Sequence, residues 1–157
     1  MNPQTAPTRT LSILVVDDDA DTALSLVEVL TMRGFSARAA FCGREAMASA
    51  WLDPPDVVIL DLVMPQMNGW ELAAALNDSA KPPVLIAISG ACGEYADERS
   101  ARAAINFHLT KPASPAELVA LLRRVGDVLE AIRGELPAAY GGLSAAGFGR
   151  TLQGLAG

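Results

Sequence analysis

The sequence predicts one α/β domain, in which five parallel strands form a doubly wound sheet with helices on both faces. Short β-branched runs alternate five times with longer amphipathic stretches between Leu11 and about Arg133. The runs at 57–60 and 84–88 are apolar at successive positions, which indicates strands that are covered on both faces. Parallel strands need crossover connections, and the amphipathic stretches supply helices for them.

Each element is expected from its own local pattern. The expected strands are 11–16, 35–40, 56–60, 84–88 and 105–109. The expected helices are 20–33, 43–52, 69–77, 94–104 and 115–132. The last helix has Ser114 as a suitable N-cap, Pro115 at its first position and Glu117 three residues after the cap. Gly34 is expected to end the first helix, and the mixed composition of 35–40 suits an edge strand.

The bulk composition is that of an ordinary globular chain. Its 157 residues are enough for one domain with a substantial core. The formal net charge of −6 argues against direct binding of nucleic acid, which needs clustered Lys and Arg. No apolar run approaches the roughly 20 residues that a membrane span requires, so we expect no membrane association.

Both ends of the chain differ from the region between them. Residues 1–10 are polar, lack the apolar core of a signal peptide and are expected to be a disordered leader. Residues 134–157 hold seven of the thirteen glycines, which is typical of a tail or linker. Cys42 and Cys92 lie far apart without a CxxC motif, so we expect reduced thiols in a cytoplasmic protein.

Polar side chains follow four of the expected strands, at the point where each strand ends. Asp17 and Asp18 follow the first strand, and Asp61 follows the third. Ser89 ends the fourth strand, and Lys111 comes shortly after the fifth. Ligand sites of open α/β sheets lie outside the carboxyl ends of the strands. The set therefore indicates a divalent cation and phosphoryl chemistry on a carboxylate.

Each of these residue types has a role in that chemistry. Asp17, Asp18 and Asp61 offer the hard oxygen ligands that Mg²⁺ prefers. Asp61 is the expected nucleophile, which would form an acyl phosphate. Lys111 can direct a cation at the phosphoryl oxygens, and Ser89 can donate a hydrogen bond to them.

Four motifs together resemble the receiver domain of two-component response regulators. They are Val15-Val16-Asp17-Asp18-Asp19, Asp61-Leu62-Val63-Met64-Pro65-Gln66-Met67-Asn68-Gly69, Ala87-Ile88-Ser89-Gly90 and Thr110-Lys111-Pro112. The resemblance covers residues 11 to about 132, and we take 11–133 as the domain. It implies a flavodoxin-like fold with strand order 2-1-3-4-5, of the stand-alone, chemotaxis-regulator-like type.

The resemblance also implies a mode of action. The backbone carbonyl of Val63 would be a further Mg²⁺ ligand, while Ser89 and Lys111 would follow the phosphoryl group and relay a surface change. The phosphoryl group would come from a sensor histidine kinase or a phosphotransfer protein. A downstream protein would recognise the face formed by 94–104, 105–109 and 115–132. Such a chain is a switch rather than an enzyme, since it catalyses only its own phosphotransfer and dephosphorylation.

One position departs from the family. Three residues before Lys111, where the family often has Tyr or Phe, this chain has His108. His108 is either a solvated surface imidazole or a switch side chain that adds pH sensitivity. Trp51 and Trp70 are expected to be partly buried packing residues. Asp19 is expected to be an acid at a helix N-terminus rather than a ligand.

Four alternatives stay open at this point. The chain could be the receiver module of a larger regulator or hybrid kinase, with 134–157 as the linker. A haloacid-dehalogenase-like phosphatase would share the Asp, Ser and Lys but needs a later acidic pair, which 112–157 lacks. A phosphorylation-independent binding module usually loses one of the site residues. A calcium loop starting at Asp17 would have Thr22 in place of its glycine.

Overall fold

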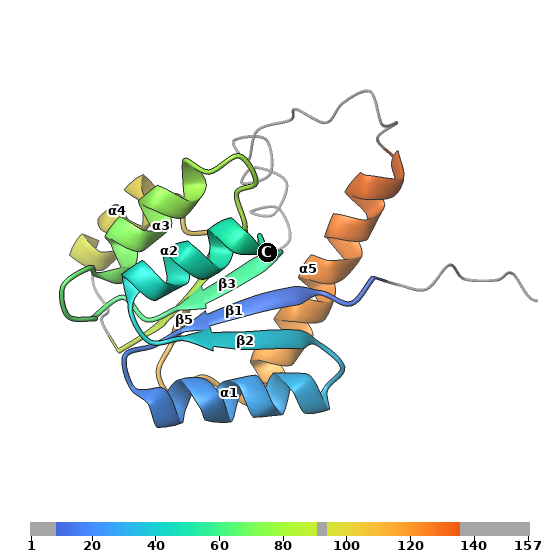
Figure 1. Cartoon of the computed structure of the whole chain (residues 1–157), viewed down its shortest axis with the longest axis horizontal. Coiled ribbons are helices and arrows are strands. Elements are labelled where there is room, and N and C mark those ends of the chain that lie inside the picture. The colour runs from blue at the N-terminus through green and yellow to red at the C-terminus, as the bar shows by residue number, and fades with distance from the viewer. Residues whose placement is uncertain (1–8, 91–93, 136–157) are drawn as a thin grey trace, which may run out of the picture.

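The computed structural model describes residues 9–90 and 94–135, and in this part of the chain five strands alternate with five helices (Figure 1). The strands are β1 (Ser12–Val16), β2 (Ser36–Ala40), β3 (Val57–Leu60), β4 (Val84–Ser89) and β5 (Phe107–Thr110). The helices are α1 (Ala20–Met32), α2 (Gly43–Leu52), α3 (Gly69–Asn77), α4 (Glu94–Arg102) and α5 (Pro115–Glu135).

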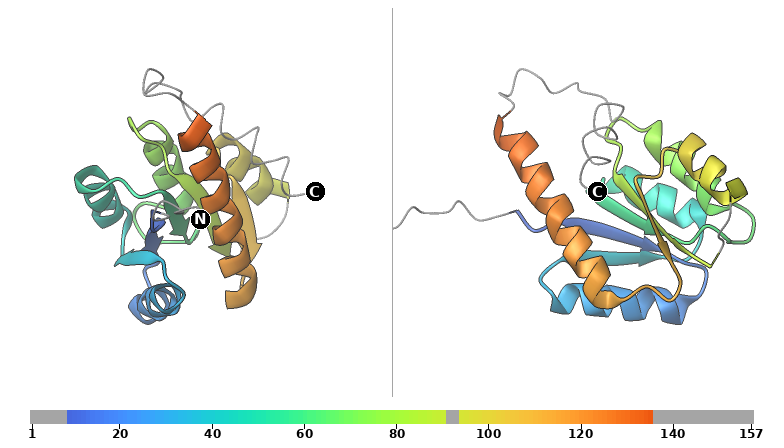
Figure 2. Two further views of the ribbon diagram at one scale, coloured as in Figure 1. Left: turned by 90° about the vertical axis from the view of Figure 1, so that its right-hand side faces the viewer. Right: turned by 180° about the vertical axis from the view of Figure 1, so that it is seen from behind.

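The strands form one parallel sheet in the order β2-β1-β3-β4-β5, which confirms the predicted fold class. The strand at 36–40 lies at an edge of the sheet, as its mixed composition predicted. Helices α1 and α5 cover one face, and α2, α3 and α4 cover the other (Figures 1 and 2). The sheet is therefore buried on both faces, as the continuous apolar runs required.

Each face of the sheet has its own apolar core. Side chains alternate along a strand, so Ile13 and Val15 of β1 pack with α1 and α5, whereas Leu14 and Val16 pack with α2 and α3. These four side chains are at most 3% exposed. Burying an aliphatic side chain of this size contributes about 1.5–3 kcal/mol to stability, so the two cores hold the strand ends in place.

The predicted helix ends are largely confirmed. Asp19 is the N-cap of α1, and its side chain accepts hydrogen bonds from the backbone N–H groups of Asp21 and Thr22. Hydrogen bonding to Thr22 is the largest cause of the lowered pKa of Asp19. Gly34 follows the helix with a φ of 90°, which favours glycine. Since a strand precedes these acids where a calcium loop needs a helix, the calcium-loop alternative is wrong.

Three boundaries differ from the prediction around β5, one of which is its last residue, Thr110 instead of residue 109. Helix α4 ends at Arg102, and Ala104 after it has a φ of 54°. β5 begins at Phe107 instead of residue 105. Asn106 explains the shorter strand: its side-chain oxygen accepts the N–H of Leu85 (2.8 Å) and so replaces a backbone partner.

The two tryptophans have different environments. Trp70 is partly buried, as expected. Trp51 was expected to be partly buried as well, but it is 85% exposed at the end of α2, so that prediction was wrong. Its neighbour Leu52 is 84% exposed. The apolar character of Trp51 alone did not reveal that its position on α2 faces away from the sheet.

Helix α5 continues to Glu135, three residues beyond the predicted end. Near this end, Arg133 donates a hydrogen bond to Asp56 (2.6 Å), the residue that precedes β3. Most of the predicted leader (1–8) and of the predicted tail (136–157) lies outside the described residues.

Candidate functional site

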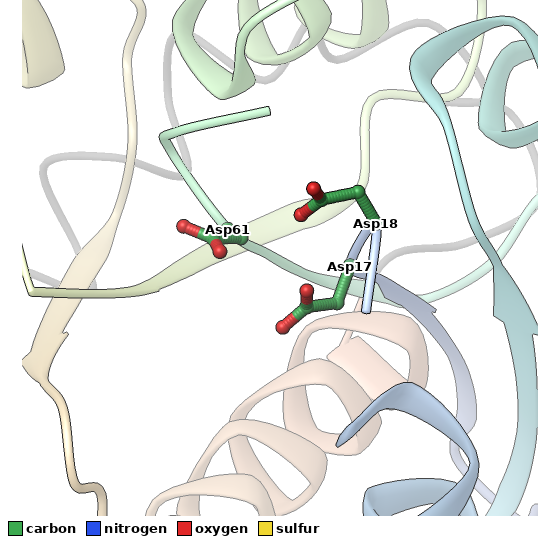
Figure 3. Close-up of side chains that lie close together, drawn as sticks. All are labelled: Asp17, Asp18 and Asp61. Carbon is green, nitrogen blue, oxygen red and sulfur yellow. The ribbon is translucent and has the colours of Figure 1, made fainter. Parts of the chain in front are cut away.

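The predicted site residues gather at the carboxyl edge of the sheet. Asp17 and Asp18 follow β1, and Asp61 follows β3, which is the neighbour of β1. Figure 3 shows the three side chains close together. Their carboxylate oxygens all lie within 4.8 Å of one another. The structure thus brings Asp61 together with two adjacent acids that lie more than forty positions earlier in the chain.

Two of these acids are buried, which gives the site its electrostatic character. Asp17 is 7% exposed and Asp61 is 9% exposed, whereas Asp18 is exposed. Each buried carboxylate accepts one backbone hydrogen bond from two residues further on: Asp17 from Asp19 (3.0 Å) and Asp61 from Val63 (3.1 Å). These short turns fix the direction of both carboxylates.

Lys111 is the cation of the site. Its Nζ lies 2.9 Å from Asp61 Oδ2 and 3.5 Å from Asp17 Oδ2. Burial alone would lower the pKa of Lys111, but the hydrogen bond and charge of Asp61, together with Asp17, outweigh burial and raise that pKa. The lysine is therefore charged and directed at the carboxylates.

The acids nevertheless outnumber the cation. Among the described residues, three carboxylates face one ammonium group, so two negative charges are in excess if all groups are ionised. Burial raises the pKa of Asp17; the N–H of Asp19 and the charge of Lys111 oppose this rise, and the charges of Asp61 and Asp18 add to it. A divalent cation would relieve this cost, and carboxylate oxygens are the ligands that Mg²⁺ prefers. The donor set fits this ion.

Ser89 and Lys111 meet at the neighbouring strand ends. Ser89 is the last residue of β4 and is 1% exposed, and its carbonyl accepts the backbone N–H of Lys111 (3.1 Å). The peptide bond between Lys111 and Pro112 is cis. Ser89 thus lies at the same edge as the acids. The role of its hydroxyl stays a prediction, as does that of the Val63 carbonyl.

His108 lies within β5, opposite Ala87 of β4, and is partly buried. It is therefore not a fully solvated imidazole on the surface. Nothing in its placement selects the switch role, which stays a prediction.

Gly69 is a residue whose importance the sequence did not reveal. It begins α3, and its N–H donates to the carbonyl of Leu62 (3.0 Å). A Cβ at this position would lie 2.3 Å from the backbone oxygen of Asp61 and 2.7 Å from the Cα of Leu62. Only glycine lets α3 approach the Asp61 backbone this closely. The residue before it, Asn68, is the N-cap of α3.

Comparison with known proteins identifies the family. The sequence pattern of the response regulator receiver domain matches residues 13–123. The chain belongs to this family. The site described above thus occupies the carboxyl edge of a receiver domain, and the predicted resemblance is confirmed.

Known proteins of two kinds are similar to this receiver domain. The transcriptional regulatory protein PrrA of Mycobacterium tuberculosis is 38% identical over 123 residues, which cover 73% of this chain and 51% of PrrA. An uncharacterised 14.6 kDa protein of Leptolyngbya boryana is 36% identical over 118 residues, which cover 73% of this chain and 88% of that protein. The chain spans about half the length of the first of these relatives.

Among solved structures, the chemotaxis protein CheY4 of Vibrio cholerae superposes with a TM-score of 0.71 at 26% identity, covering 74% of this chain and 98% of CheY4. This likeness supports the five-stranded fold.

The helices in the described part of the chain are too short or too polar to cross a membrane.

Proposed function

We propose that this receiver domain accepts a phosphoryl group on Asp61 in the presence of Mg²⁺ and thereby changes the surface that a partner protein recognises. The observation that carries the proposal is the cluster of Asp17, Asp18 and Asp61 at adjacent strand ends, with Lys111 in contact with two of the acids. The family membership supports a signalling switch rather than a metabolic enzyme. Catalysis is then limited to the domain's own phosphotransfer and dephosphorylation.

Asp61 would be both the nucleophile and a metal ligand, whereas Asp17 and Asp18 would be metal ligands only. Asp17, Asp18, Asp61 and the Val63 carbonyl would hold Mg²⁺, which neutralises charge on phosphoryl oxygens when it is bound. A carboxylate oxygen of Asp61 forms the new bond to phosphorus as the bond from phosphorus to the donor breaks. Asp61 Oδ1 accepts the N–H of Val63 and Oδ2 contacts Lys111, so the carboxylate is already oriented by two partners.

Lys111 and Ser89 respond to the product. Lys111 Nζ contacts Asp61 Oδ2 at 2.9 Å before phosphorylation, and a new phosphoryl oxygen beside that carboxylate competes for the ammonium group. Ser89, at the adjacent strand end, donates a hydrogen bond to the phosphoryl group. The contacts at the ends of β4 and β5 therefore change when Asp61 is phosphorylated.

The phosphoryl donor is a sensor histidine kinase or a phosphotransfer protein, and the output is a protein partner in the cytoplasm. The net charge of −6 supports the absence of direct nucleic-acid contact by these residues. The face of α4, β5 and α5 is the proposed output surface. The match to this chain covers only about half of PrrA, which favours a second arrangement in which this receiver works within a longer regulator.

Intact-mass measurement after incubation with Mg²⁺ and acetyl phosphate tests the proposal. The expected adduct adds about 80 Da, the mass of one phosphoryl group. It should be absent in Asp61→Ala and strongly reduced in Asp18→Ala. Asp53→Ala is the matched control, because this aspartate is exposed at the end of α2 and should leave the adduct unchanged. An adduct that persists in Asp61→Ala would overturn the assignment.

A further inference from the structure

Helix α3 is in direct contact with the proposed phosphorylation site. Its first residue, Gly69, packs so closely on the backbone of Asp61 and Leu62 that there is no room for a side chain. The N–H of Gly69 also donates to the carbonyl of Leu62 at 3.0 Å. A shift of the Asp61 backbone toward α3 therefore cannot be absorbed at this contact and displaces the start of α3, since packed interiors transmit displacement.

The next residue of α3 contacts α4. Trp70 donates a hydrogen bond from its indole Nε1 to the Ser100 hydroxyl at 3.1 Å. Ser100 is 7% exposed, so the bond is shielded from water. The guanidinium carbon of Arg99 lies 4.2 Å from the centroid of the Trp70 ring, which is within the range of a cation–π interaction. One side chain from the first turn of α3 thus makes two directional contacts with consecutive residues of α4.

The far end of α3 is bound to α4 as well. Asn77, the last residue of α3, donates from Nδ2 to the carbonyl of Ala103 (2.6 Å), just after α4 ends. Two polar contacts, separated by the length of α3, therefore fix α4 to this helix. The two helices are positioned to move together.

We propose that α3 transmits the phosphorylation state of Asp61 to α4, and that Trp70 is the residue that positions α4 in response. This inference rests on the proposed phosphorylation of Asp61. Phosphorylation displaces the Asp61–Leu62 backbone, Gly69 passes the displacement to α3, and the contacts of Trp70 with Arg99 and Ser100 rearrange. Trp70, Arg99 and Arg102 line a shallow groove between the two helices, so the rearrangement alters a surface open to a partner.

The route is independent of β5, where His108 stands three residues before Lys111. It needs neither a swing of that side chain nor a change in its protonation. Its components are the close contact at Gly69 and the two contacts of Trp70.

Fluorescence gives the first test, because the chain has two tryptophans in different environments. Trp51 is 85% exposed on α2, so Trp51→Phe leaves Trp70 as the single reporter without disturbing the core. Mg²⁺ and acetyl phosphate should change the emission intensity or wavelength of Trp51→Phe. The matched variant Trp70→Phe, which reports on Trp51 alone, should show no change. Intact mass of each sample records whether the adduct has formed.

Hydrogen exchange gives the second test. Phosphorylation of the wild type should alter the protection of backbone amides in residues 98–103, and Trp70→Phe should at least halve that difference. Phenylalanine keeps a ring beside Arg99 but cannot donate to Ser100. In the unphosphorylated state, Trp70→Phe should keep the wild-type protection of 98–103, which separates a lost response from a structural loss of α4. Trp51→Phe should behave like the wild type.

The outcomes separate the two proposals. If no adduct forms in the wild type, the proposed phosphorylation is wrong, and this inference falls with it. If the adduct forms while the emission of Trp70 stays unchanged, or if Trp70→Phe keeps the full exchange difference, phosphorylation stands and the α3 route is overturned.

Discussion

The two ends of β3 carry aspartates that are alike in burial and contacts, but we propose different roles for them. Asp56 precedes the strand and Asp61 follows it, and each is 9% exposed. Each gives one carboxylate oxygen to a backbone N–H: Asp56 accepts from Ser12 (2.9 Å), and Asp61 accepts from Val63 (3.1 Å). The other carboxylate oxygen of each aspartate contacts a cation, which is Arg133 for Asp56 and Lys111 for Asp61. Neither burial nor ion pairing distinguishes the two positions.

The surrounding charge distinguishes them. In the part of the chain that the structure describes, Asp56 has one partner of opposite charge, Arg133, at 2.6 Å, so the pair is neutral. Asp61 shares Lys111 with Asp17, and Asp18 lies in the same cluster, so negative charge is in excess. A balanced pair, in which the two charges cancel, stabilises one structure. An unbalanced cluster, which has excess negative charge, can bind a cation and, with it, a phosphoryl group. We infer that the excess of like charge, rather than the buried acid itself, marks the functional edge.

The largest expected effect on stability comes from breaking the balanced pair. Asp56→Asn removes the charge that pairs with Arg133, and we expect a loss of about 2 kcal/mol, below the 3–5 kcal/mol typical of buried pairs. The expected loss of stability is below that range because the Arg133 side chain is 45% exposed and can be hydrated. The melting temperature should fall by roughly 8 °C, measured by circular dichroism.

The same variant should still form the phosphoryl adduct in full at temperatures below its transition. If Asp56→Asn lost the adduct while it remained folded, the assignment of separate roles to the two ends of β3 would be incorrect. Arg133→Gln should destabilise the protein in the same direction, because it leaves Asp56 buried without its cation.

The second effect concerns the unbalanced cluster and Mg²⁺. At a Mg²⁺ concentration ten times the dissociation constant, a ligand that binds only the folded state adds about 1.4 kcal/mol, which corresponds to a rise of roughly 5 °C in melting temperature. Asp18→Asn should lose most of this gain, since it removes the exposed carboxylate of the cluster. Asp56→Asn should keep the gain. An equal response to Mg²⁺ in wild type and Asp18→Asn would contradict the proposed metal site.

The sequence predicted the fold well where local signals and burial agree. The helices at 43–52 and 69–77 have the predicted bounds, and α3 begins at the cap Asn68. The strand at 57–60 is apolar throughout because it lies inside the sheet between β1 and β4. Tertiary contacts caused the differences. The start of β5 depends on the side chain of Asn106 bonding to β4, which no local pattern expresses.

The site was predictable in its residue types and less so in its contacts. Strand ends in sequence order placed Asp17, Asp61 and Lys111 at one edge, because parallel strands share a direction. The contacts of Lys111 with two acids, and the approach of Gly69 to Asp61, depend on packing between distant segments. The pair of Asp56 and Arg133 spans 77 positions, and Arg133 lies beyond the family match, so neither periodicity nor resemblance indicated it.

The smallest expected effect tests the excess charge directly. Burial, with the nearby acids, raises the pKa of Asp17 from its usual value of 3.8, so the ionised group costs free energy in the folded state. Asp17→Asn should therefore stabilise the metal-free protein at neutral pH by about 1 kcal/mol, which is the repulsion between two like charges about 4 Å apart in bulk water and a conservative figure for a buried carboxylate. Differential scanning calorimetry in EDTA should show a rise of a few degrees, about 4 °C.

The pH dependence of this gain has a defined sign. Because the folded state binds the proton of Asp17 more tightly than the unfolded state, stability falls as pH rises from 3.8 through the raised pKa. The advantage of Asp17→Asn should therefore be complete above that raised pKa and vanish as pH falls below 3.8, where Asp17 is neutral in both states. Asp56→Asn should show the opposite sign at neutral pH, since it removes a favourable charge. If Asp17→Asn were instead destabilising in EDTA at neutral pH, the contacts of Asp17 with Lys111 would outweigh the crowding of the acids, and the contrast between the two ends of β3 would fail.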